Sequence, residues 1–249
     1  MIKRIVFYLL IFLTTFFFHQ INFNASQNNF RSFFYFGSDS DPNKQVRIDI
    51  SAFAGSDVFS LAMERIDVMF NLYHQLTNIY IPNTLGINGA YEINNNPETW
   101  VEIPEELFNL LKFSLDMNNL TNGYFDITIG SVIAYYKNAT NNYFQREISD
   151  YSFFTLLQNI ENVRRLMPNE NRLLLRIVDN LFYVKIADNV MLDFGAITKG
   201  YATNKAKEIL LSYGIKVFSI NAGHSSIALG YRLNNANLDS FNVHCNKMG

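Results

Sequence analysis

The chain has 249 residues, with 20 Lys and Arg against 22 Asp and Glu and a formal net charge of −2. That balance gives no electrostatic reason to expect a nucleic-acid partner, so this class of function is excluded from our hypotheses. Cys245 is the single cysteine, which excludes an internal disulfide and any CxxC metal or redox pair. The length suffices for one large domain or two small ones with a substantial core.

The first 26 residues predict a signal peptide or signal anchor. Lys3 and Arg4 precede an apolar run from Ile5 to Phe18. As a helix this run would measure about 21 Å, short of the ~30 Å hydrocarbon core, which favours an export signal over a full transmembrane span. The pattern predicts export to the extracytoplasmic face of the cell membrane, with membrane contact through this segment. A buried N-terminal helix is the alternative.

Residues 27–44 are rich in Asn, Ser and Asp and predict a polar tether, so we expect the folded domain to comprise residues 45–249. The alternation in "VRIDISAF" predicts a half-buried strand that begins at Val46. A helix is expected from Ser56, with an apolar stripe at steps of three and four: Ala62, Ile66, Met69, Phe70, Tyr73 and Leu76.

The stretch "TNIYIPNTLGINGAYEINNNPETW" then predicts a loop, and Pro104 marks the first turn of a second helix. Gly123 is placed to end that helix, because glycine tolerates a left-handed backbone. An extended segment, "YFDITIG", and a polar, Asn-rich region follow.

The C-terminal part mixes strands and one helix. "RLLLRIVDNLFYVKI" predicts a β-hairpin, and "MLDFGAITKGYATNKAKEILLSYG" predicts an apolar strand that ends at Asp193, then a turn and a helix closed by Gly214. "IKVFSI", part of "NAGHSSIALG" and "SFNVHC" are further expected strands. This irregular mixture predicts an α+β fold with mixed sheets and packed helices.

Two turns are candidate ligand-binding sites. Gly195 and Ala196 leave little side-chain bulk where a helix begins, and Lys199 follows, so an anionic group such as a phosphate could bind there. The alternative, which we weigh equally, is a tight turn in which Asp193 caps backbone amides. Asp126 has the same two interpretations: it belongs to a ligand site, or it bonds the backbone amides of its own turn. The sequence lacks HExxH and GxSxG patterns, which excludes a zinc hydrolase and a serine nucleophile elbow.

Three segments, "TNGYFDITIG", "LDFGAITKGYATNKAKEILLSYGI" and "SINAGHSSIALG", resemble in their order and separation the successive motifs of the ApbE family, the FAD:protein FMN transferases. The resemblance implies an α+β fold that binds FAD, cleaves its pyrophosphate with the help of Mg²⁺, and transfers FMN to a Thr or Ser hydroxyl of an acceptor protein. A metal would polarise the pyrophosphate and neutralise the charge that grows on the leaving phosphate.

The resemblance also implies roles by position at the flavin nucleotide. Tyr80 matches the family's aromatic residue in an early loop, which packs on the nucleotide. Tyr124, Phe125 and Asp126 match the family's Gly-x-Phe-Asp element, which lines the FAD site.

In the same way, Asp193 matches the acid that contacts FAD, and Lys199 matches a side chain near the nucleotide. Ala196 matches the residue whose backbone carbonyl is a ligand of Mg²⁺. No catalytic residue is assigned.

The chain departs from the family pattern at His224, where a second glycine is usual, and it lacks a His-x-x-Asp-Pro-x-Thr-Gly motif. On that ground we expect a C-terminally truncated member. Three alternatives stay open: an FMN transferase that needs the missing segment, a non-catalytic exported flavin-binding module, and an unstable remnant.

Overall fold

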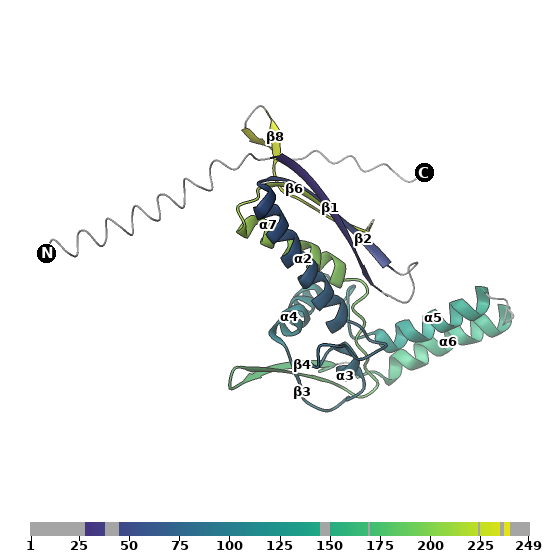
Figure 1. Cartoon of the computed structure of the whole chain (residues 1–249). Coiled ribbons are helices and arrows are strands. Elements are labelled where there is room, and N and C mark those ends of the chain that lie inside the picture. Colours follow the sequence, from purple (N-terminus) through teal and green to yellow (C-terminus); the bar gives the residue numbers. More distant parts are fainter. Residues whose placement is uncertain are drawn as a thin grey trace. The chain divides into compact units, whose positions relative to one another are not determined.

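The computed structural model describes residues 28–37, 45–144, 150–168, 170–223, 225–234 and 237–239. The chain divides into two compact units, which are described separately below. Unit 1 comprises residues 1–35, 47–67 and 205–249, and unit 2 comprises residues 36–46 and 68–204. Helices and strands occur in both, which confirms the predicted α+β class (Figure 1).

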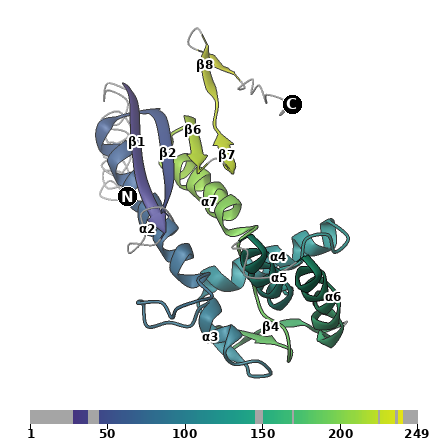
Figure 2. The same ribbon diagram turned by 90° about the vertical axis from the view of Figure 1, so that its right-hand side faces the viewer.

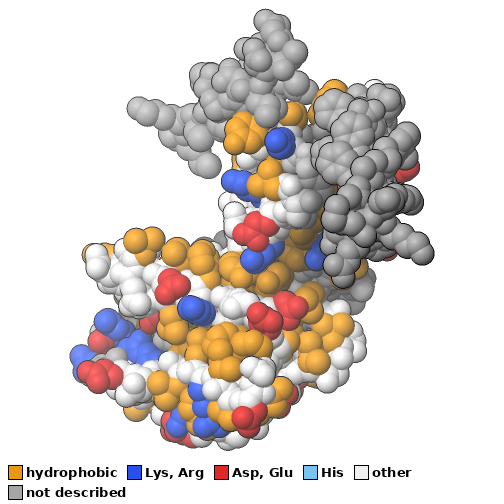
Figure 3. Space-filling model, turned by 90° about the vertical axis from the view of Figure 1, so that its left-hand side faces the viewer, with side chains coloured by type: hydrophobic (Ala, Val, Ile, Leu, Met, Phe, Trp, Pro, Cys, Tyr) orange, Lys and Arg blue, Asp and Glu red, His pale blue; other side chains and the backbone are white. Residues whose placement is uncertain are grey.

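Two predicted segments, the export signal at 1–26 and the last strand at 240–245, lie outside the described residues. Among the helices that the structure describes, none combines the length and the apolar character needed to cross a membrane. On the face shown in Figure 3, acidic and basic side chains are interspersed among hydrophobic ones, which matches the near balance of charge in the sequence.

A four-stranded sheet forms the centre of unit 1, in the order β1-β2-β6-β7. Its strands are β1 (Asn28–Gly37), β2 (Gln45–Ala54), β6 (Val217–Ala222) and β7 (Ser226–Leu229). β6 pairs antiparallel with both β2 and β7. The alternation predicted for β2 is confirmed, because Ile48, Ile50, Ala52 and Ala54 are buried.

The prediction of a polar tether was wrong for residues 28–37, which form β1 beside β2 (Figures 1 and 2). The aromatic side chains of this segment favour a strand more than its Asn and Ser residues disfavour one. The ring of Phe30 stacks on Phe59 with 5.5 Å between centroids, and Arg31 pairs with Asp49 of β2 at 3.4 Å. These contacts attach the segment to the sheet.

The helices α2 (Ser56–Leu76), α4 (Glu105–Leu120) and α7 (Thr198–Ser212) were predicted, and each of them buries apolar side chains. In α2 the stripe is buried from Ala62 to Leu76, with only Met69 half-exposed among its members. Gly214 closes α7 with a φ of 75°, and the N–H of Ile215 donates to the carbonyl of Leu210 over 3.0 Å. This is the glycine-dependent helix end that the sequence indicates.

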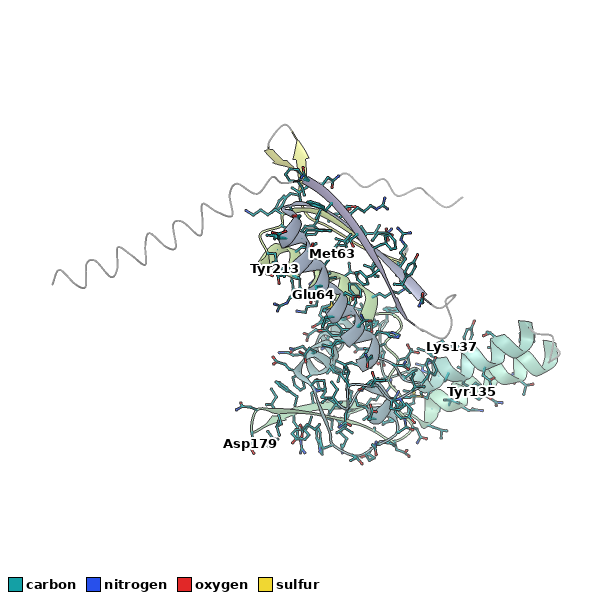
Figure 4. All side chains as sticks on the ribbon, in the orientation of Figure 1. Met63, Glu64, Tyr135, Lys137, Asp179 and Tyr213 are labelled. Atoms are coloured by element: carbon teal, nitrogen blue, oxygen red, sulfur yellow. The ribbon has the colours of Figure 1, made fainter. Side chains whose placement is uncertain are left out.

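Unit 2 contains a three-stranded antiparallel sheet in the order β3-β5-β4, formed by β3 (Val101–Ile103), β4 (Leu173–Val178) and β5 (Leu181–Ile186). The predicted hairpin β4–β5 is confirmed, and its turn places Asp179 and Asn180 at φ of 50° and 64°. Figure 4 shows Asp179 at the tip of this hairpin. The rings of Phe108 in α4 and Phe182 in β5 pack at 4.9 Å.

Several elements were not predicted. α5 (Gly130–Phe144) and α6 (Asp150–Leu166) occupy the region described only as polar and Asn-rich, and α3 (Ala90–Asn94) lies in the expected loop before β3. Asn, Thr and Tyr have low helix propensity, so local composition did not indicate α5. α5 and α6 lie side by side in Figures 1 and 2, and this packing stabilises both. The short strands β8 (Arg232–Asn234) and β9 (Asn237–Asp239) were also missed.

Candidate functional site

The segment before Asp193 lies beside the segment that follows Asp126. Met191 forms a single parallel bridge with Ile129, so the apolar strand predicted here is one bridge residue, with no regular strand around it. The N–H of Gly130 donates to the carbonyl of Met191 over 2.7 Å, and the N–H of Asp193 donates to the carbonyl of Ile127 over 2.9 Å. The structure therefore brings two of the predicted motifs together through their backbones.

Asn94, the last residue of α3, fixes this segment from its other side. Its Nδ2 donates to the carbonyl of Leu192 over 3.0 Å, and its Oδ1 accepts from the N–H of Leu192 over 2.7 Å. The side chain of Leu192 is fully buried. One side-chain amide thus satisfies both backbone groups of a core residue directly before Asp193, as a neighbouring strand would. No motif or periodicity around Asn94 indicates this role.

Asn94→Ala is expected to lower the free energy of unfolding by about 2–3 kcal/mol, because the N–H and carbonyl of Leu192 lose their partners beside a buried side chain. Urea unfolding followed by circular dichroism measures the change. Asn95→Ala is the matched control, since Asn95 is exposed and bonds only locally, to the carbonyl of Tyr91. An equal loss in both variants would contradict a special role of Asn94.

Asp193 uses both carboxylate oxygens within the protein. Oδ1 accepts from the N–H of Gly195 over 2.8 Å, and Oδ2 lies 3.4 Å from Nζ of Lys137 in α5. The Asp193 side chain is only 11% exposed, whereas that of Lys137 is 53% exposed. A β-carbon on Gly195 would lie 3.0 Å from Oδ1, so the small residue expected here makes room for the turn. The capping interpretation of Asp193 is therefore confirmed by its bond to Gly195.

A pocket of about 260 Å³ opens beside this carboxylate. It is lined by the end of α2 and the loop after it, by Lys137 and by the turn at Asp193: His74, Thr77, Asn78, Ile79, Tyr80, Lys137, Asp193, Phe194 and Gly195. Tyr80 is 71% exposed, and Oδ1 of Asn78 accepts from its backbone N–H over 2.9 Å. Two predicted site residues, Tyr80 and Asp193, thus line the same pocket.

Tyr124, Phe125 and Asp126 do not line this pocket. Oδ1 of Asp126 accepts from the N–H and Oγ1 of Thr128 over 2.8 and 2.7 Å, and Oδ2 pairs with Arg172 at 3.1 Å. The carboxylate therefore has the local capping contacts that the sequence allowed as an alternative. Tyr124 is 96% exposed, so its ring is available to a ligand.

Lys199 lies in the first turn of α7 and Ala196 in the turn just before it, and neither lines the pocket. Within the described residues, no hydrogen bond reaches the carbonyl of Ala196, and Nζ of Lys199 has no hydrogen bond or ion pair. The described parts of the chain contain no group of three His, Cys, Asp or Glu side chains that could hold a metal ion. The carbonyl of Ala196 could supply one oxygen ligand of the kind that Mg²⁺ prefers.

The sequence did not indicate Lys137, Arg172 or Asn94 as parts of this region. His74 and Asn78 also line the pocket, and their closeness to Tyr80 in the chain is a signal that could have found them. Lys137 offered no comparable signal, because α5 itself was not predicted.

Residues 42–246 match the sequence profile of the ApbE family. Among solved structures, the fold is similar to that of the flavin transferase ApbE from Vibrio cholerae (TM-score 0.57, 14% identity, 84% of this chain and 62% of that chain). It is also similar to the ApbE protein from Thermotoga maritima (0.50, 21%, 79% and 57%) and to the flavinyl transferase ApbE from Pseudomonas stutzeri in its apo form (0.54, 13%, 79% and 55%). The chain thus spans about three fifths of the length of these structures. No curated protein sequence matches it.

Proposed function

Because the chain belongs to the ApbE family, we propose that it is an FAD:protein FMN transferase. The single observation that carries this proposal beyond the family is the pocket in which Tyr80 and Asp193 meet, beside the turn that opens α7. It combines the exposed aromatic ring of Tyr80, which can stack on a ring of a nucleotide, with the cation of Lys137, which can pair with a phosphate. Its volume is below the usual range for a whole ligand, so it would hold one part of FAD.

In the proposed reaction, a Thr or Ser hydroxyl oxygen of the acceptor protein forms a bond to the phosphorus of the FMN half. The bond from that phosphorus to the bridging oxygen breaks, AMP leaves with the electron pair, and the hydroxyl proton is released. Tyr80 would stack on a ring of the nucleotide, and Lys199 would face its phosphates. Asp193 would fix the turn at Gly195 through the hydrogen bond described above. Tyr124, Phe125 and Asp126 would contribute a second wall of the FAD site.

We also propose that the reaction depends on Mg²⁺, with the carbonyl of Ala196 as one ligand. The ion would polarise the pyrophosphate and neutralise charge on the departing phosphate. The observation that supports this ligand is the carbonyl oxygen without a hydrogen bond within the described residues. The chain's own part is to hold that oxygen in the turn that precedes α7.

The chain is further proposed to act at the extracytoplasmic face of the membrane on an exported acceptor protein. Lys3, Arg4 and the apolar run from Ile5 to Phe18 support this proposal. This segment lies outside the described residues, so the argument is one of sequence pattern alone.

A non-catalytic flavin-binding module is the second candidate. It is favoured by the motif carboxylates, which already bond within the protein: Asp193 to Gly195 and Lys137, and Asp126 to Thr128 and Arg172. The two candidates make different predictions for the full chain purified in detergent and mixed with FAD.

The transferase is expected to release AMP when Mg²⁺ is present, to attach flavin covalently to an acceptor protein from the exported fraction, and to lose both reactions in EDTA. AMP is measured by chromatography, and bound flavin by fluorescence of a denaturing gel. A binding module would quench flavin fluorescence without AMP release. No FAD binding by a folded sample would contradict both candidates.

A further inference from the structure

Lys137 is the cation that faces the pocket from α5, an element that neither the sequence nor the family motifs placed at the site. We infer that Lys137 binds a phosphate group of the nucleotide and neutralises the carboxylate of Asp193 beside it. This inference rests on the proposed function, because it names a further residue of the same site. Figure 4 shows Lys137 on α5, and its Nζ lies 3.4 Å from Oδ2 of Asp193.

The charges of the pocket require such a cation. Among the described residues that line it, Asp193 is the one acid and Lys137 the one Lys or Arg. A carboxylate that is only 11% exposed would oppose a phosphate brought beside it, because like charges repel strongly where water is scarce. Lys137 neutralises Asp193 and allows an anionic group to enter.

The ammonium group of Lys137 can still donate hydrogen bonds to a ligand. It has three N–H donors, and only one of them points at Asp193 in the pair described here. The distance of 3.4 Å is longer than the 2.7–2.9 Å typical of strong charge-assisted hydrogen bonds, so the ion pair does not lock the side chain. More than half of the Lys137 side chain is exposed, which leaves the other donors accessible.

The backbone fixes where Lys137 stands. α5 begins at Gly130, whose N–H donates to the carbonyl of Met191, and Oγ of Ser131 donates to the carbonyl of Asn189 over 3.2 Å. Lys137 lies about two helical turns beyond Gly130, so both residues are on the same face of α5. The first turn of the helix is therefore bonded to the segment that leads into Asp193, and this places Lys137 over the carboxylate.

An exposed ion pair with no ligand role is the simpler interpretation, and it would contribute little to stability. The two interpretations differ in what Lys137→Gln does to binding. We expect this variant to bind FAD and inorganic pyrophosphate about 10-fold more weakly or worse, as for the loss of a hydrogen bond to a charged group. Lys137→Arg should restore most of the affinity, and riboflavin, which has no phosphate, should bind as before.

The experiment measures these affinities by flavin fluorescence and calorimetry on the full chain, with circular dichroism to confirm folding. Lys112→Gln is the matched control, because Lys112 is an exposed lysine of α4 outside the pocket. The inference is supported if Lys137→Gln alone weakens FAD and pyrophosphate and if the loss shrinks at high salt.

Equal affinities of Lys137→Gln and Lys112→Gln for FAD would overturn the inference and leave the proposed function standing. An equal loss for riboflavin would also overturn it, since that loss cannot come from a phosphate. If the unaltered chain binds pyrophosphate but not FAD, both the proposed function and the assignment of Lys137 to a nucleotide phosphate fail. If it binds FAD without releasing AMP, the proposed transfer fails, and weaker FAD binding in Lys137→Gln still supports Lys137. Binding of neither ligand by the unaltered chain would overturn both.

Discussion

Asp193→Ala is expected to weaken FAD binding by about 10-fold or more while the chain stays folded. The substitution removes the acceptor of the Gly195 N–H, so the turn beside the pocket loses the hydrogen bond that fixes it, and it also removes the ion-pair partner of Lys137. If the turn must be ordered again when FAD binds, the lost hydrogen bond to a charged group, worth about 1.5–3 kcal/mol, is subtracted from the free energy of binding, which corresponds to a factor of 10 or more. Titration of FAD by fluorescence quenching measures the change.

Asp193→Asn separates the two contributions of this side chain. Asn keeps an oxygen for the N–H of Gly195 but loses the charge that attracts Lys137. We expect it to retain the turn and to bind FAD with an affinity between those of Asp193→Ala and the unaltered chain. Unchanged affinity in Asp193→Ala, with a folded sample, would show that this turn is not the nucleotide site.

Gly130→Ala is expected to destabilise the chain by about 3 kcal/mol, the upper part of the range for inserting a methyl group where there is no room. A β-carbon on Gly130 would lie 2.5 Å from the carbonyl oxygen of Met191 and 2.9 Å from its carbonyl carbon. Both atoms belong to the backbone, so they cannot turn aside as a flexible side chain could. The measurement is the midpoint of urea unfolding.

Gly200→Ala provides the control for this prediction. Gly200 is exposed in α7, where the same substitution should stabilise the helix by about 0.5 kcal/mol because alanine has the higher helix propensity. The two variants are thus expected to differ in sign. A gain of stability in Gly130→Ala would mean that the contact between α5 and Met191 is not formed.

The elements that were predicted correctly are those whose own sequence carries a periodic apolar pattern or a turn signal. The apolar stripe from Ala62 to Leu76 indicated α2, and the paired positions around Asp179 and Asn180 indicated the hairpin β4–β5. α5 and α6 have no comparable signal, because they are stabilised chiefly by each other. β1 was missed for a related reason: its aromatic residues matter only once β2 and α2 are present to receive them.

The residues of the site likewise divide into those that local sequence motifs indicate and those that they do not. Tyr80 and Asp193 could be found from motifs, and the structure places both in one pocket. Lys137 and Asn94 could not be found, because their roles depend on contacts with residues far away in the chain and not on their own neighbours. Asp126 was found as a motif residue, but its contacts with Thr128 and Arg172 could not be deduced from spacing.

The two hydrogen bonds between Asn94 and Leu192 have a consequence for the order in which the chain folds. Asn94 and Leu192 are 98 residues apart in the sequence, and Lys137 and Asp193 are 56 residues apart. Contacts between residues so distant in sequence form slowly, because a long loop must close before they contribute any free energy. Helices α2, α4 and α7 depend on local contacts and can form earlier. We therefore expect the pocket to be assembled late in folding, when most of unit 2 is already in place.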